Sequence, residues 1–162
     1  MKNFLLSLAV AIAAVAIVSG CGAARMTTAE KALVEQTVLQ QLDAKDYTVL
    51  IQFMIPSAGP SRAVTNYSVK VSGDTLVSYL PYFGRAYNLP YGGGKGLDFT
   101  APISAYQDLL RTDGSHEILI RCSNDEDSFL YAIDIYGNGN AFLTVSSRNR
   151  ETISYSGELD LP

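Results

Sequence analysis

The chain has few of the side chains from which metal centres and disulfides are built. Its 162 residues include one histidine, two cysteines and no tryptophan. A zinc site needs three or four converging ligands of the His, Cys or carboxylate type. Cys21 falls within a predicted lipid-attachment signal, which leaves Cys122 without an internal disulfide partner. We therefore expect no disulfide, no metal and no other cofactor.

Positive charge is also scarce. The sequence has 12 Lys and Arg against 16 Asp and Glu, for a formal net charge of −4. The basic residues are scattered and form no stripe that would follow a phosphate backbone. Nucleic acid is therefore not an expected partner.

Familiar catalytic motifs are missing as well. No Gly-x-Ser-x-Gly elbow occurs, and the glycine run at 92–96 lacks the other residues of a phosphate loop, because Leu89 replaces its first glycine and Gly96 its Ser or Thr. His116 and Cys122 lie six residues apart on one predicted strand, roughly 20 Å, and share a face that should point toward the core. We predict that the protein is not an enzyme and regard a hydrolase as the least expected function.

Acidic residues form two candidate features. The stretch "NDED" at 124–127 has enough carboxylates for a hard cation, but it is more typical of a polar hairpin turn. Asp134 shares a predicted strand face with Leu130 and Ala132. A buried carboxylate there would need a partner or a shifted pKa; the alternative is a carboxylate near the strand end that bonds into the adjacent turn.

The N-terminus contains one long apolar run. Lys2 precedes the run from Phe4 to Val18, which is shorter than the ~20 residues that span a bilayer and is typical of a secretory signal. It ends in "VSGC", whose last residue is Cys21 and which resembles the bacterial lipobox. We predict that residues 1–20 are a lipoprotein signal peptide, that Cys21 is the lipid-attachment residue and that 21–27 form a short tether.

This prediction implies a membrane as partner, through N-terminal acyl chains. No acidic run follows Cys21. An acidic stretch directly after the lipidated cysteine resembles a surface-export signal. The lipobox therefore predicts a lipid anchor in the bacterial envelope, and the missing acidic run favours the outer membrane facing the periplasm.

Residues 28–162 are predicted to form a single domain that begins with a helix. Thr27 and Glu30 have the spacing of a capping box, and Val34, Val38 and Leu42, with Leu39 beside them, form an apolar stripe. The stripe predicts a helix over 28–44 that packs on its own domain. The opposite face lacks the Lys and Arg excess of helices that lie on membranes.

Alternating apolar residues and turn signals fill the rest of the chain. They predict strands near 47–55, 67–71, 76–80, 97–101, 106–110, 116–123, 128–136, 141–147 and 153–161. We therefore expect an α+β, mainly β fold, in which the helix packs on an antiparallel meander of eight or nine strands that forms a curved sheet, a sandwich or a barrel. Because the run at 128–136 is apolar on both faces, we expect it in mid-sheet with the helix over its second face.

One connection, Pro81 to Lys95, is longer than a turn requires, and long connections in compact domains often carry function. Large aromatic side chains around an arginine suit binding of a sugar, a peptide or an aromatic ligand. The candidate ligand-binding residues of segment 79–96 are Tyr79, Tyr82, Phe83, Arg85, Tyr87 and Tyr91. The alternative is a lid whose rings pack into the sheet.

The stretch "GDTLVSYLPYFGRAYNLPYGGGKGLDFTAPI", with "YSVKV" before it and "ISYSG" near the end, resembles a Bacteroidetes lipoprotein family known as domain of unknown function 4251. The resemblance implies a lipoprotein of Bacteroidetes origin and supplies no activity, ligand or catalytic residue. Asp74-Thr75-Leu76 also resembles the O-glycosylation motif of that phylum, with Thr75 as acceptor.

These observations predict an envelope lipoprotein that acts as a non-catalytic binding or accessory module through segment 79–96. Its expected partners are an envelope protein or a glycan. The alternative is a structural or assembly partner of other envelope proteins.

Overall fold

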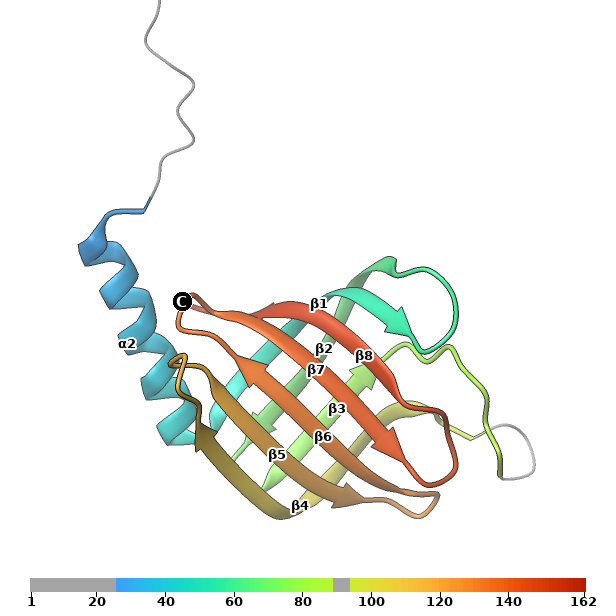
Figure 1. Cartoon of the computed structure of the whole chain (residues 1–162). Helices are drawn as coiled ribbons and strands as arrows, with labels where there is room; N and C mark the ends of the chain where they lie inside the picture. Colours follow the sequence, from blue (N-terminus) through green and yellow to red (C-terminus); the bar gives the residue numbers. More distant parts are fainter. Residues whose placement is uncertain (1–25, 89–93) are drawn as a thin grey trace, which may run out of the picture.

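The computed structural model describes residues 26–88 and 94–162, which form a helix followed by eight antiparallel strands (Figure 1). Cys21 and Tyr91, two of the predicted site residues, lie outside this range. The elements are α2 (Thr28–Ala44), β1 (Asp46–Pro56), β2 (Arg62–Ser72), β3 (Thr75–Leu80), β4 (Leu97–Leu110), β5 (His116–Ser123), β6 (Ser128–Ile135), β7 (Asn140–Ser147) and β8 (Ile153–Leu159). Among the described helices, none is long and apolar enough to cross a membrane.

The strands form a closed barrel. Each strand pairs with the next one along the chain, and β8 pairs with β1, so no edge of the sheet is left open. This confirms the mainly β antiparallel meander and decides among its predicted forms. The closing seam contains a bulge between Ile51 and Phe53 on β1. A Cβ atom on Gly157 of β8 would overlap the carbonyl oxygen of Leu50 at this seam, so closure requires glycine there.

Side chains fill the barrel interior. Every strand contributes buried residues, among them Val49, Val71, Leu76, Leu97, Ile118, Ile133, Leu143 and Tyr155. The polar groups among them are paired: the Tyr131 hydroxyl donates to Ser78 Oγ at 2.9 Å, and Ser78 donates to the Leu97 carbonyl at 2.7 Å. Pairing of this kind removes the cost of burying a hydroxyl.

Two strands predicted separately, at 97–101 and 106–110, are one long strand, β4. A bulge between Ile103 and Ala105 breaks the alternation of its side chains, which explains why the sequence pattern suggested two segments. The barrel therefore has eight strands.

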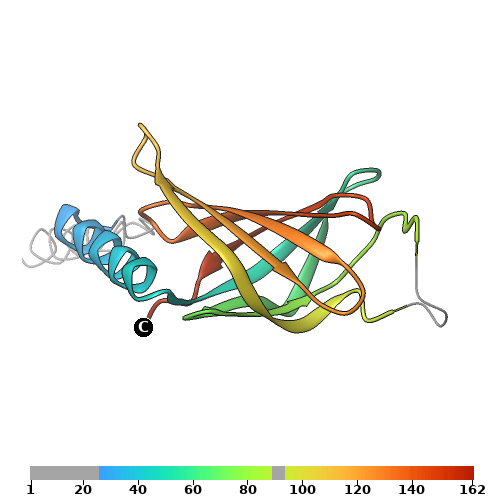
Figure 2. The ribbon, with the colours of Figure 1, turned by 90° about the horizontal axis from the view of Figure 1, so that it is seen from below.

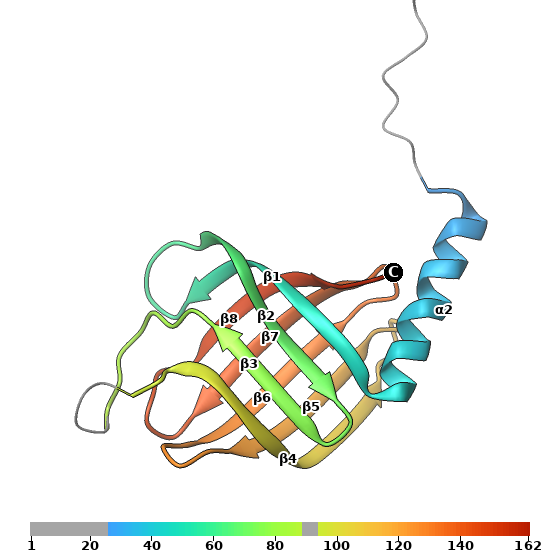
Figure 3. The same ribbon diagram turned by 180° about the vertical axis from the view of Figure 1, so that it is seen from behind.

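The helix begins and ends where the sequence predicts, and its capping box between Thr27 and Glu30 is formed. Val38 and Leu42 are buried, whereas Leu39 is 40 % exposed and lies outside the packed stripe. The helix lies across one end of the barrel and does not cover the outer face of β6, as Figures 1 and 3 show. The prediction that the helix covers residues 128–136 is therefore wrong. Barrel closure buries the inward face of β6, and the side chains on its outward face are partly exposed.

The barrel has two distinct ends. The helical end comprises α2, the turn at 73–74, the β4–β5 hairpin tip at 111–115, the turn at 136–139 and the C-terminal residues (Figure 2). The distal end comprises the connections at 57–61, 81–96, 124–127 and 148–152. Thr75, the predicted O-glycosylation acceptor, is exposed and begins β3 at the helical end; its modification stays a prediction.

Candidate binding surface at the distal end

Residues 81–88 run along the β7–β8 connection at the distal end. The Tyr87 amide donates to the Asn149 carbonyl at 2.8 Å, and the Glu151 amide donates to the Arg85 carbonyl at 2.9 Å. These backbone hydrogen bonds tie residues 85–87 to the β7–β8 connection although they belong to no named strand.

The Tyr82 side chain packs beneath this segment and bonds to its backbone. Its ring is partly buried against the core, and its hydroxyl lies 2.8 Å from the Arg85 carbonyl oxygen and 3.1 Å from that of Glu151. Burial raises the pKa of Tyr82, so the hydroxyl stays protonated and able to donate at neutral pH. A Cβ on Gly84 would lie 2.8 Å from this hydroxyl, which explains the glycine in the turn.

The neighbouring candidate side chains face the solvent. Tyr87 is 68 % exposed, and Phe83 and Tyr79 are each 47 % exposed. One face of the Phe83 ring carries the Arg62 guanidinium, whose central carbon lies 4.4 Å from the ring centre. The segment thus combines a packed Tyr82 with exposed rings. Ligand binding by the exposed rings stays a prediction.

An open hollow of about 560 Å³ lies between this segment and the β1–β2 connection. Its lining residues are Ala58, Tyr82, Phe83, Gly84, Arg85 and Glu151. The Glu151 carboxylate accepts a hydrogen bond from the Arg85 amide at 3.2 Å. Aromatic rings, a guanidinium and a carboxylate therefore meet around one concave surface, which is the mixture that orients a small polar ligand.

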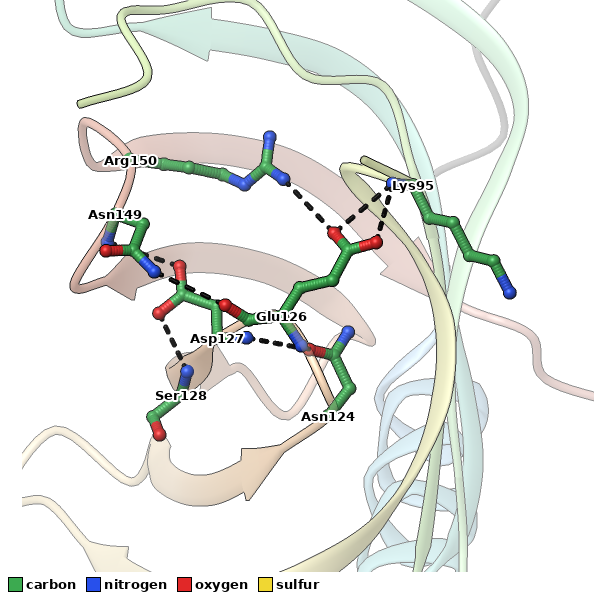
Figure 4. Close-up of polar contacts among 7 residues, drawn as sticks. All are labelled: Lys95, Asn124, Glu126, Asp127, Ser128, Asn149 and Arg150. Carbon is green, nitrogen blue, oxygen red and sulfur yellow. Dashed lines mark hydrogen bonds and ion pairs between the residues drawn. The ribbon is translucent and has the colours of Figure 1, made fainter. Parts of the chain in front are cut away.

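The other end of the long connection is tied to the barrel by Glu126 (Figure 4). The Lys95 amide donates to both oxygens of its carboxylate at 3.2 and 3.3 Å. Arg150 Nη2 lies 3.6 Å from Glu126 Oε2, and the Arg150 guanidinium lies over the Tyr82 ring with 5.6 Å to the ring centre. Arg150 is only 7 % exposed, and its Nε has no hydrogen-bond partner among the described residues.

The turn at 124–127 places Glu126 in this position. Asn124 Oδ1 accepts from the amides of Glu126 and Asp127 at 2.9 Å each, and Asp127 in turn accepts from the amides of Ser128 and Asn149. The stretch "NDED" is therefore a hairpin turn, as predicted, and it also links three connections of the distal end.

Sequence reasoning missed the residues that complete this surface. Glu126, Arg150 and Glu151 lie far from segment 79–96 in the chain. Glu126 belongs to the acidic stretch at 124–127, but nothing in that stretch links it to segment 79–96. For Arg150 and Glu151 the signal is the density of charged residues at 148–152.

The helical end holds a second polar group and a larger hollow. Arg111 in the β4–β5 hairpin pairs with Glu117 at 2.9 Å and with Asp134 at 3.1 Å. Burial raises the pKa of Asp134, and the Arg111 charge opposes this shift. Asp134 thus has its partner in the hairpin.

The hollow at the helical end, about 770 Å³, lies between α2 and the turn at 136–139. Its lining has no aromatic ring and consists of Met26, Lys31, Val34, Glu35, Gly137 and Asn138.

His116 and Cys122 do not form a site together. Cys122 is 2 % exposed, which confirms its predicted burial, and burial raises its thiol pKa to about 11. His116 is partly buried and its Nδ1 lies 2.8 Å from Asp108 Oδ1. Within residues 26–88 and 94–162, no three His, Cys, Asp or Glu side chains are grouped so that they could hold a metal ion.

Comparison with known proteins places the fold in a family. Residues 29–159 match the family described as Domain of unknown function (DUF4251). The chain belongs to the DUF4251 family. A crystal structure of a DUF4251 family protein from Bacteroides eggerthii DSM 20697 is similar to it, with a TM-score of 0.63 and 20 % identity over 84 % of this chain and 92 % of that chain. No curated protein is significantly similar in sequence. The DUF4251 fold is therefore established, and its function has to be argued from the surface.

Proposed function

We propose that this DUF4251 protein is an envelope lipoprotein whose barrel binds a saccharide at the distal end without catalysing a reaction. The observation that carries the proposal is the pairing of a fixed backbone with exposed rings at Phe83 and Tyr87. A surface that is ordered before binding loses little conformational entropy on binding. Aromatic side chains held in this way supply large contact areas with few rotatable bonds.

The chemistry of the hollow favours a sugar over an apolar ligand. A pyranose has an apolar C–H face, which can lie on an aromatic ring, and a rim of hydroxyl groups. Phe83 offers such a ring, and Arg85 and Glu151 offer a donor and an acceptor for the hydroxyl groups. The described residues that line the hollow include a single carboxylate and no Ser, Cys or His, in keeping with binding rather than hydrolysis.

Binding is tested with a printed array of bacterial envelope oligosaccharides, followed by calorimetric titration of the saccharide that binds most strongly. Phe83→Ala and Tyr87→Ala should each weaken binding by about fivefold to tenfold, the loss of a contact worth roughly 1 kcal/mol or more. Tyr136→Ala, an exposed tyrosine at the helical end, is the matched control and should change affinity less than twofold. An array without a binder would contradict the saccharide assignment.

The lipoprotein part of the proposal rests on Lys2, the apolar run and the "VSGC" box. Metabolic labelling with palmitate should modify the wild-type chain and leave Cys21→Ala unlabelled. If the Cys21→Ala protein still carried label and still fractionated with membranes, the anchor would not be at Cys21.

An assembly role is the second candidate, and one feature of the outer wall favours it. Phe53 of β1 and Phe142 of β7 both pair with Ser156 of β8, so the two rings flank β8 on the outside of the barrel. They are 45 % and 37 % exposed. Exposed apolar groups that lie together mark protein-contact surfaces. A Phe53→Ser, Phe142→Ser double variant that loses an envelope protein partner on cross-linking, while keeping saccharide binding, would support this role instead.

A further inference from the structure

The two ends of the barrel expose different kinds of side chain. At the helical end, Leu110 is 71 % and Leu33 is 65 % exposed, the largest values for aliphatic residues in the described part of the chain. Met26 and Leu109 are 48 % and 41 % exposed at the same end. We call these four residues the helical-end surface. The distal end instead exposes aromatic and charged groups.

Leu110 and Leu33 belong to two separate elements at the helical end of the barrel. The β4–β5 hairpin and α2 both extend from the same end of the barrel, as seen in Figures 1 and 2. Arg111, next to Leu110, is held against the wall by Glu117 and Asp134. The β4–β5 ladder reaches the pair Leu110 and His116, and in this position the Leu110 side chain lies in solvent.

The length of chain before the helix limits how far this end can lie from an anchor at Cys21. Met26 follows Cys21 by five positions, so their Cα atoms are at most about 18 Å apart when the chain is fully extended. The barrel wall is longer: β1 has 11 residues, about 33 Å along the strand and roughly 25 Å along a barrel axis to which strands tilt by about 40°. A chain anchored at Cys21 therefore keeps α2, and not the distal end, close to the lipid.

We propose that the helical-end surface contacts the lipid bilayer and that the distal end points away from it. This inference rests on the lipid attachment at Cys21 in the proposed function. Leu33 and Leu110 then meet the headgroup and acyl boundary, where exposed leucines lose contact with water. This contact depends on the anchor at Cys21, because the polar face of α2 lacks the Lys and Arg excess of helices that bind membranes by themselves. The binding segment is held on the far side of the barrel, where envelope saccharides can reach it.

The experiment uses the acylated full-length protein, purified from membranes and reconstituted into phosphatidylethanolamine and phosphatidylglycerol vesicles that contain nitroxide-labelled lipid. Single cysteines for an environment-sensitive fluorophore replace Leu110 at the helical end, Phe142 on the outer wall and Ser61 at the distal end, all of them exposed. Cys122→Ala removes the native thiol from each variant. Circular dichroism confirms that each labelled variant is folded.

The inference predicts that the label in the Leu110→Cys variant shifts to shorter emission wavelength and is quenched several-fold more strongly than the labels in Phe142→Cys and Ser61→Cys. Strongest quenching in Phe142→Cys would mean that the barrel lies on its side, and equal quenching at all three would mean no fixed orientation; either result overturns the inference. Mass measurement of the N-terminal peptide separates the causes. An unmodified Cys21 would overturn the anchor as well, whereas an acylated Cys21 with the wrong quenching pattern would overturn the orientation alone.

Discussion

Glu126→Gln should destabilise the barrel, because it removes the counter-charge of a buried arginine. The Arg150 side chain is 6 % exposed and that of Glu126 is 22 % exposed. Removing one partner of a fully buried ion pair costs about 3–5 kcal/mol. Glu126 is partly solvated and the 3.6 Å separation is longer than a good charged hydrogen bond, so we expect about 1–2 kcal/mol. Glutamine keeps an oxygen that can accept from the Lys95 amide, which confines the loss to the charge.

A double-mutant cycle separates this interaction from other effects of the substitutions. Arg150→Met keeps the length of the side chain and removes its charge, and the double variant leaves neither charge buried. The free energy of unfolding of chain 26–162, measured in urea at pH 7, should therefore fall less in the double variant than the sum of the single losses, by about 1–2 kcal/mol. Each kcal/mol corresponds to roughly 2–4 °C in Tm for a chain of this size.

The cycle also has a local readout and a clear contrary outcome. Because the Lys95 amide bonds to Glu126, its hydrogen exchange should quicken in Glu126→Gln relative to amides of the distant strand β5. Additivity of the two substitutions within about 0.3–0.5 kcal/mol would show that Glu126 and Arg150 do not interact in the folded protein, and the reasoning would be refuted.

Three further changes test separate parts of the structure. Gly157→Ala should lower the free energy of unfolding by at least ~3 kcal/mol because its methyl group overlaps the β1 backbone. Gly137→Ala meets only a flexible side chain and should be nearly neutral in the same urea titration. Equal effects of the two substitutions would contradict the close approach of β1 and β8 at Gly157. Tyr82→Phe should cost about 0.5–1.5 kcal/mol because it removes the one O–H donor that the Arg85 and Glu151 carbonyl oxygens share. An unchanged urea midpoint would show that this hydroxyl does not stabilise the segment. Burial raises the pKa of Cys122 to about 11, so the thiol should react with an aromatic disulfide reagent at pH 8 only in unfolding concentrations of urea. A reaction in native buffer at the rate of a free thiol would show that the Cys122 thiol is accessible.

Local sequence patterns account for the helix and for most of the strands. The capping box at Thr27 and the spacing of Val38 and Leu42 fix the helix, because both depend on residues within two turns of each other. The short turns at 72–74 and 137–140 likewise predict hairpins from adjacent residues. These interactions are local, so the sequence alone is sufficient to find them.

Closure of the sheet could not be predicted in the same way. It depends on a bulge after Ile51 meeting Gly157 more than a hundred residues later in the chain, and a glycine in a strand is equally typical of a tight bend or of a ligand that approaches the backbone. The merger of two predicted strands into β4 was hidden by a second bulge. Bulges disturb the alternation on which strand prediction relies.

For the candidate surface as well, local features could be predicted from the sequence and tertiary contacts could not. The aromatic residues of segment 79–96 are conspicuous in the sequence, and Phe83 and Tyr87 are exposed, whereas their role as a platform stays a prediction. Whether a given ring packs or projects depends on tertiary contacts, as Tyr82 shows. Arg150 and Glu151 come from another connection altogether, and only the folded barrel brings them beneath the segment.

Saccharide binding by the exposed rings of the distal end can be decided by one calorimetric comparison. The saccharide that binds most strongly on the array is titrated into the wild type, into Phe83→Ala/Tyr87→Ala and into the control Tyr136→Ala/Phe142→Ala. We expect the distal-end variant to lose affinity by about 25-fold to 100-fold, because the two single losses of fivefold to tenfold multiply. The control should stay within about twofold of the wild type. Equal affinity in the wild type and the distal-end variant, or a larger loss in the control, would contradict saccharide binding by these rings.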